Sequence, residues 1–196
     1  MLTDILVIDG HDGAGKTSIA QRLDPEYGRY VKPFGGTLGD HIAWLAGKAR
    51  TSDERWAEVD ATARAAVESV LEQHADAERL IFDRHWLSMF TLLPEAYRLA
   101  WYPVPHTVLC WTSLDVTLHR LDRRGEALGD VAAHRHYIEA YADLAARYRV
   151  PVVDTSELTP EEATAEVVRL AGLTPVARSV GTPRSVGDYP LYDQPV

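Results

Sequence analysis

Apolar runs alternate with longer segments of helical periodicity along most of the chain. The apolar runs predict strands over residues 4–9, 29–33, 79–83, 106–112 and 150–154. Apolar side chains at three- and four-residue spacing predict helices over 16–24, 37–48, 53–75, 114–124, 131–149 and 160–171. Strands that alternate with helices are typical of a parallel sheet covered by helices on both faces. The pattern therefore predicts a three-layer α/β fold with a five-stranded parallel sheet.

The end of the chain differs from the rest. Thr159 and Pro160 form a helix-start signal, and Gly172 provides the corresponding stop signal. Residues 173–196 contain four prolines and no apolar periodicity. We expect residues 1–172 to form one domain. The tail 173–196 is either disordered or packs on its own domain or a neighbour through Tyr189, Leu191 and Tyr192.

Charge and composition argue against several classes of protein. The formal net charge of −9 argues against a general nucleic-acid-binding surface, which needs clustered cations. No stretch approaches the roughly 20 apolar residues of a membrane-spanning helix, and the first strand leaves no room for a signal peptide. Cys110 is the only cysteine and lies in an apolar run, as expected for an inert core thiol. We expect a cytoplasmic protein without a membrane partner.

The strongest motif lies directly after the first predicted strand. Residues 10–17 read GHDGAGKT and match the phosphate-binding pattern GxxxxGK[ST]. Glycines let backbone N–H groups surround phosphate oxygens, and the following helix N-terminus adds partial positive charge. In such a loop Lys16 reaches the β- and γ-phosphates, and Thr17 places its hydroxyl on Mg²⁺. The alternative is a chance glycine-rich turn, but the strand before it and the helix after it favour binding of a nucleoside triphosphate.

Two further groups of residues suggest phosphoryl chemistry. Asp83 ends a predicted strand and can orient Mg²⁺ or accept a proton, while Arg84 can clamp phosphate. A surface ion pair is the alternative. Arg120, Arg123 and Arg124 share one face at a helix end, and Gly125 and Gly129 follow, which suggests a lid near 124–132. Ordinary capping of the helix C-terminus explains the same arginines without a function.

In these and neighbouring segments the chain resembles thymidylate kinases and related nucleoside and nucleotide kinases of the P-loop class. The matching segments are residues 8–17, 32–39, 82–88, 118–125 and 152–156, in the order found in that family. The resemblance implies the strand order 2-3-1-4-5, ATP and Mg²⁺ as cofactors, and phosphoryl transfer to a small acceptor. It also implies a possible homodimer, for which Trp44, Trp56 and Trp101 are candidate contacts.

The resemblance also implies roles for individual residues. The expected ATP-binding residues are Asp12, Gly13, Ala14, Gly15, Lys16, Thr17, Ser18, Arg120 and Arg124. The expected catalytic residues are Lys16, Asp83, Arg84, Arg120 and Arg124. Thr17 and Asp83 are the expected Mg²⁺ ligands. The expected acceptor-binding residues are Asp12, Phe34, Arg64, Arg84 and His85.

Several positions on the acceptor side depart from the family pattern. Lys32 replaces an acid, Phe34 is additional, His85 replaces a tyrosine, and Thr112 stands where an aspartate is frequent. The acceptor therefore stays open between a nucleoside monophosphate such as dTMP, a nucleoside, and another small alcohol such as a modified nucleoside. A non-catalytic P-loop switch protein is the alternative from a different class.

Overall fold

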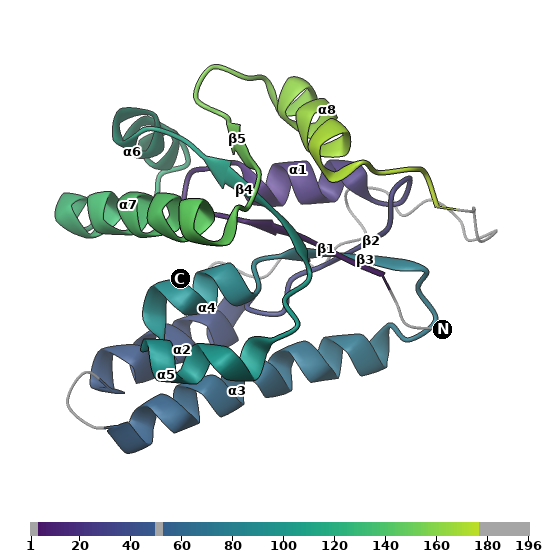
Figure 1. The fold of residues 1–196 in the computed structure, drawn as a ribbon. Helices are drawn as coiled ribbons and strands as arrows, with labels where there is room; N and C mark the ends of the chain where they lie inside the picture. The colour runs from purple at the N-terminus through teal and green to yellow at the C-terminus, as the bar shows by residue number, and fades with distance from the viewer. Residues whose placement is uncertain (1–3, 50–52, 177–196) are drawn as a thin grey trace.

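The computed structural model describes residues 4–49 and 53–176 and shows one five-stranded sheet. The strands are β1 (Asp4–Asp9), β2 (Arg29–Val31), β3 (Arg79–Asp83), β4 (His106–Trp111) and β5 (Val152–Asp154). All neighbouring strands run parallel in the order β2-β3-β1-β4-β5 (Figure 1). The α/β class and the strand order are as the sequence predicted.

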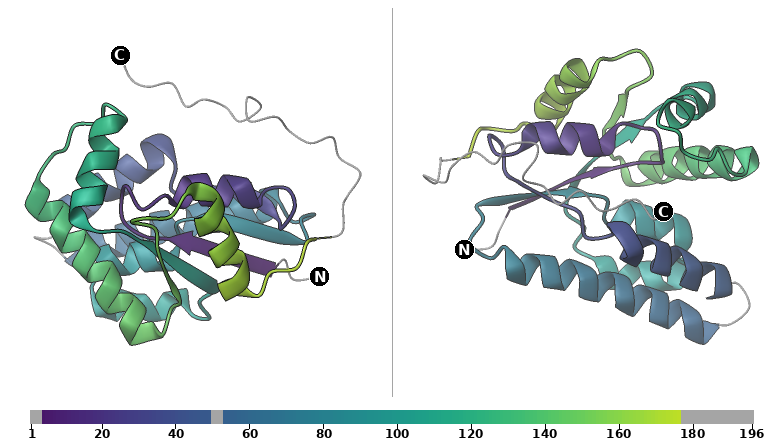
Figure 2. Two further views of the ribbon diagram at one scale, coloured as in Figure 1. Left: turned by 90° about the horizontal axis from the view of Figure 1, so that it is seen from above. Right: turned by 180° about the vertical axis from the view of Figure 1, so that it is seen from behind.

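Helices cover both faces of this sheet, as the two views of Figure 2 show. The longer helices are α1 (Lys16–Leu23), α2 (Gly36–Ala49), α3 (Asp53–Gln73), α6 (Leu114–Arg123), α7 (Val131–Tyr148) and α8 (Pro160–Ala171). The shorter ones are α4 (Trp86–Leu92), α5 (Glu95–Arg98) and the 3₁₀ helix η1 (Leu99–Trp101). Helices α1 and α8 lie on one face, and α2, α3, α4 and α7 pack on the other.

The three short helices between β3 and β4 were missed by the sequence prediction. Helix α4 is seven residues long, and five of them are buried, so it shows no alternation of apolar and polar faces. Pro94 and Pro103 interrupt the segment that follows. Periodicity cannot identify a short helix that is surrounded by other elements. The other predicted elements are present, with ends that differ by up to two residues.

The sheet divides the core into two clusters. Ile19, Leu23 and Val167 belong to the cluster beneath α1 and α8. Phe82 and Tyr141 belong to the larger cluster on the opposite face, which also contains the apolar side chains of α2, α3 and α4. Tyr141 connects this larger cluster to α7, so α7 is held against the same face as α4.

The carboxyl ends of β1, β3 and β4 meet at one edge of the sheet, where the chain turns sharply. Gly10 follows β1 with φ +144°, and a Cβ atom at this position would lie 2.1 Å from the Cys110 carbonyl oxygen. Only glycine allows β1 and β4 to approach so closely here. Cys110 is buried, and burial raises the pKa of its thiol to about 12, as expected for an inert thiol.

The first residues of the tail lie on their own domain. Arg79 donates a hydrogen bond to the Thr174 carbonyl oxygen, and the Val176 N–H donates to the Glu26 carbonyl oxygen. Tyr189, Leu191 and Tyr192 lie outside the described residues. No helix in the described part of the chain is both long enough and apolar enough to cross a membrane.

The three tryptophans considered as dimer contacts lie in different environments. Trp101 is buried, Trp56 is half-buried, and Trp44 on α2 is 56% exposed. Trp44 is thus the one of the three that offers an extensive surface. The homodimer stays a prediction.

Candidate active site

The loop between β1 and α1 has the geometry of an anion-binding turn. Gly13 and Gly15 have φ values of +78° and +82°, in the left-handed region that glycine adopts without strain. Gly15 is the N-cap of α1 and provides no side-chain cap for the helix. The N–H groups at the start of α1 are therefore available to an anion such as phosphate.

A cleft of about 210 Å³ opens over this loop. It is lined by Asp12, Gly13, Gly15, Lys16, Thr17, Ser18, Lys32, Arg84, Arg124 and Glu126. Four cationic side chains face two carboxylates there. The cleft is therefore locally positive, although the chain has a net charge of −9. A small anionic ligand fits this arrangement better than an extended polyanion.

Lys16 lies at the base of the cleft. Its Nζ donates a hydrogen bond to the His11 carbonyl oxygen over 2.7 Å. Burial lowers the pKa of Lys16 to about 8. A buried ammonium with one neutral acceptor gains strongly from an anionic partner, and phosphate oxygens at the loop would supply one.

Asp83 lies beside Thr17, fully buried at the end of β3. Its Oδ2 accepts hydrogen bonds from Thr17 Oγ1 over 2.5 Å and from the Tyr30 hydroxyl over 3.4 Å. Its Oδ1 is buried and has no hydrogen-bond partner among the described residues. A carboxylate oxygen left unpaired next to a threonine hydroxyl fits a hard cation such as Mg²⁺, which prefers oxygen ligands.

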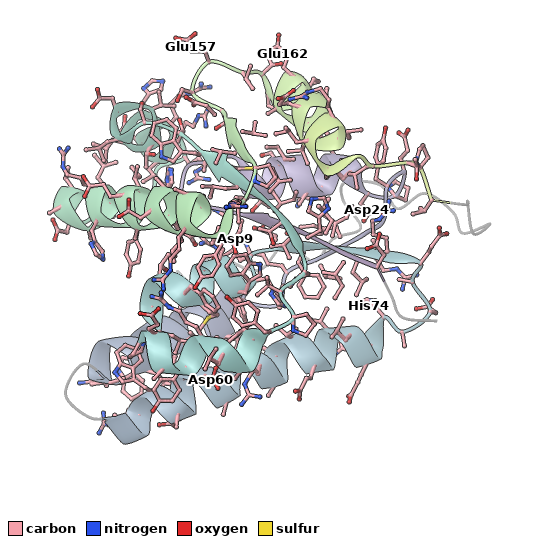
Figure 3. The ribbon with its side chains drawn as sticks, in the orientation of Figure 1. Asp9, Asp24, Asp60, His74, Glu157 and Glu162 are labelled. Atoms are coloured by element: carbon pink, nitrogen blue, oxygen red, sulfur yellow. The ribbon has the colours of Figure 1, made fainter. Side chains whose placement is uncertain are left out.

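Asp9 connects the loop to the start of α4, and Figure 3 shows it at the centre of the molecule. Its Oδ1 accepts from the Gly10 N–H over 2.8 Å and from Ser88 Oγ over 2.6 Å. Its Oδ2 accepts from the N–H groups of His85 and Ser88, both over 3.0 Å. These N–H groups lie at the start of α4, so a carboxylate from β1 caps a helix that has no cap of its own.

Arg84 adopts the left-handed conformation, with φ +75°, at the turn between β3 and α4. Its guanidinium donates to the Gly10 carbonyl oxygen, to Ser88 Oγ, to the Tyr141 hydroxyl and to the Asp12 carboxylate. Burial opposes its charge, but the acidic groups around it raise the pKa of Arg84 above its usual value. The guanidinium is thus a fixed positive charge at the wall of the cleft.

The predicted lid arginines have different positions. Arg120 donates to the Gly13 carbonyl oxygen over 3.0 Å and to the Thr155 carbonyl oxygen over 2.5 Å, and it does not line the cleft. Arg124 lines the cleft and forms an ion pair with Glu126 over 3.0 Å. Arg120 therefore connects α6 to the loop and to β5, whereas Arg124 is positioned to contact a ligand. Residues 125–130 join α6 to α7, where the sequence predicts the lid.

The predicted acceptor residues other than Asp12 and Arg84 do not line the cleft. Phe34 is 8% exposed and belongs to the core. Arg64 pairs with Asp60 on its own helix over 3.0 Å. His85 is buried edge-on against two aromatic rings, and its Nδ1 has no hydrogen-bond partner among the described residues. Acceptor contacts by these three residues stay predictions.

Sequence reasoning missed His11, which links the loop to β4. The ring is buried, donating from Nδ1 to the Asp12 carbonyl oxygen over 2.8 Å and accepting at Nε2 from the Thr112 N–H over 3.3 Å. Burial lowers the pKa of His11 to about 4, so the ring is neutral near pH 7. Asp9, Ser88 and Tyr141 were also given no role. The sequence placed Asp9 at a strand end, but nothing in it paired Asp9 with α4 or α7.

The comparisons with known proteins support the fold. No protein-family model and no curated protein matches this chain. Deoxyadenosine kinase from M. mycoides with bound dATP has a TM-score of 0.57 at 16% identity, covering 86% of this chain and 99% of that one. The same enzyme with the products dCMP and a flexible dCDP bound has a TM-score of 0.56 at 14% identity, covering 86% and 98%. TT1252 from Thermus thermophilus has a TM-score of 0.56 at 17% identity, covering 89% and 100%. At these identities the similarity shows a shared fold, and the activity must be argued from the site.

We expect Asp9→Asn to destabilise the protein by about 3 kcal/mol, because an amide cannot accept all four hydrogen bonds that the carboxylate accepts. Urea unfolding measures the change. Asp143→Asn, at an exposed position on α7, is the matched control and should change stability by less than about 0.5 kcal/mol. Equal stability of the two variants would contradict the role given to Asp9.

The buried histidines predict acid sensitivity. Burial lowers the pKa values of His11 and His85 to about 4, below the ordinary 6.5 that applies in the unfolded chain. The contribution of the two neutral rings to the free energy of unfolding is complete above pH 6.5. It is lost as the pH falls towards 4, because the unfolded state then binds more protons than the folded state. Between pH 7 and pH 5, each histidine should lower the free energy of unfolding by about 2 kcal/mol. Urea unfolding of His11→Gln should show a weaker pH dependence than the original protein, and an identical dependence would contradict this assignment.

Proposed function

We propose that this protein transfers the γ-phosphoryl group of ATP to a nucleoside or a nucleoside monophosphate. The observation that carries the proposal is the unpaired, buried Oδ1 of Asp83 beside Thr17 at the phosphate-binding loop. A loop that only bound phosphate would not need an unsatisfied carboxylate oxygen at that point. Such an oxygen suits the Mg²⁺ that accompanies ATP, and the cations Arg84 and Arg124 at the same cleft favour transfer of the phosphoryl group over binding alone.

The loop would hold the donor. Backbone N–H groups at the start of α1 would contact the phosphates, and Lys16 would exchange its bond to the His11 carbonyl oxygen for a phosphate oxygen. Thr17 and Asp83 would hold Mg²⁺, which when bound neutralises negative charge on the phosphate oxygens. Arg120 would keep the loop in place through the Gly13 carbonyl oxygen.

Fixed positive charge would favour the transfer itself. Negative charge spreads over the transferring group in the transition state, and catalysis consists mainly of positioning and electrostatic stabilisation. Arg84 is held by four internal acceptors, so it needs little reorganisation to act on that charge. Arg124 reaches the same cleft from the end of α6, and movement of residues 125–130 would bring it onto the phosphates.

The solved structures support a small nucleoside or nucleotide as the ligand class. Deoxyadenosine kinase of the same fold holds dATP in one structure and dCMP with dCDP in another. We further propose that the protein is cytoplasmic and acts on a small-molecule acceptor. Trp44 is the proposed contact of a homodimer. A kinase of another small alcohol would use the same donor site, so only the acceptor distinguishes the two.

Lys16→Ala should lower the rate of phosphoryl transfer at least a hundredfold, because the transition state loses a buried positive charge. The assay follows product mass with Mg²⁺–ATP and a panel of nucleosides, nucleoside monophosphates and sugar alcohols. Lys48→Ala, which removes a lysine outside the cleft, is the control and should keep its activity.

Near-normal turnover by Lys16→Ala would contradict the mechanism. Slow hydrolysis of ATP with no phosphorylated product from any acceptor would favour the switch-protein alternative.

A further inference from the structure

The four cations of the cleft differ in how much hydrogen-bonding capacity they have left. Arg84 is bound to four oxygen acceptors of the protein. Arg124 pairs with Glu126, and Lys16 belongs to the phosphate-binding loop. Lys32 makes one ion pair, in which its Nζ lies 3.7 Å from Asp83 Oδ2. That separation exceeds a normal hydrogen bond, so the three N–H donors of Lys32 are largely unused within the described residues.

Lys32 lies on the opposite side of the cleft from the predicted lid. Lys32 directly follows β2, which is the edge strand beyond β3. Arg124 reaches the cleft from α6, which follows β4 on the opposite side of β1. The loop, with the phosphates that it would hold, lies between the two. A ligand that meets the γ-phosphate from the β2 side would therefore contact Lys32, whose side chain is 39% exposed.

The carboxylates in and beside the cleft also affect which kind of acceptor can react. An alcohol must lose its proton when it attacks phosphorus, which requires a base. Asp12 is paired with Arg84 and Glu126 with Arg124, and Asp83 beside the cleft is the carboxylate proposed above to hold the metal. The oxygen of a phosphate dianion needs no base to attack. Its additional charge does need a cation, and Lys32 supplies one.

We propose that Lys32 binds an anionic group of the acceptor, so that the acceptor is a nucleoside monophosphate and not the uncharged nucleoside. This inference rests on the proposed kinase function. An oxygen of the acceptor phosphate forms a bond to the γ-phosphorus of ATP. The bond from that phosphorus to the β–γ bridging oxygen breaks, and ADP leaves with the electron pair. Lys32 determines specificity by favouring the charged acceptor on the β2 side of the cleft.

Equilibrium binding tests this role without relying on turnover. The protein is saturated with Mg²⁺ and a non-hydrolysable ATP analogue, so that the loop is occupied. It is then titrated calorimetrically with four common deoxynucleosides and their 5′-monophosphates. At least one monophosphate should bind ten times more tightly than its nucleoside, as expected for a charge-assisted hydrogen bond. Lys32→Gln should remove most of that preference while leaving nucleoside affinity within about threefold.

Two matched variants complete the test. Lys32→Arg should restore at least part of the preference, because it keeps the positive charge. Lys48→Gln removes the same charge outside the cleft and should keep the preference in full. The inference is overturned if no monophosphate binds, if every nucleoside binds as tightly as its monophosphate, or if Lys32→Gln keeps the preference. Failure of the ATP analogue itself to bind would instead overturn the proposed kinase function.

Discussion

The buried carboxylate of Asp9 is the constraint on which the site depends. It joins the first residue of the phosphate-binding loop to the start of α4, and through Ser88 it reaches Tyr141 on α7. A buried carboxylate is costly unless its lone pairs are satisfied, and here four donors satisfy them. Three elements distant in sequence must therefore take up one arrangement. That arrangement turns Arg84 towards the cleft and sets its distance from Asp12.

The same network explains how an acidic protein would hold the anionic ligand that we propose. Most of the carboxylates that produce the net charge of −9 lie away from the cleft, where four cations face two acids. The cations are proposed to play different roles because their hydrogen-bond partners within the protein differ. Arg84 is rigid because protein oxygens surround it, whereas Lys32 forms a single long ion pair among residues 4–49 and 53–176 and can exchange it for a ligand. Charge held in a small, partly enclosed volume acts more strongly than the same charge on an open surface.

The sequence predicted the fold and the meeting of Thr17 with Asp83 at the loop after β1, because both depend on local patterns. The loop motif, the alternation of strands and helices, and Asp83 at a strand end can each be identified from a few neighbouring residues. The acceptor half depends on contacts between distant segments. Asp9 with α4, His11 with β4 and Tyr141 with Arg84 are separated by dozens of residues and leave no periodic signal. Phe34 and Arg64 are predicted from the resemblance alone, and the structure gives both of them partners within the protein.

A crystal structure with Mg²⁺ and a non-hydrolysable ATP analogue would show whether the loop after β1 holds the nucleotide. We expect phosphates on the loop, with Lys16 moved from the His11 carbonyl oxygen to a phosphate oxygen and the metal beside Thr17 and Asp83. A nucleotide bound elsewhere would contradict the proposed function. The apolar groove of about 450 Å³ between α7 and the β4–β5 edge is the alternative location. Phosphates on the loop with the metal remote from Asp83 would contradict the role given to that carboxylate.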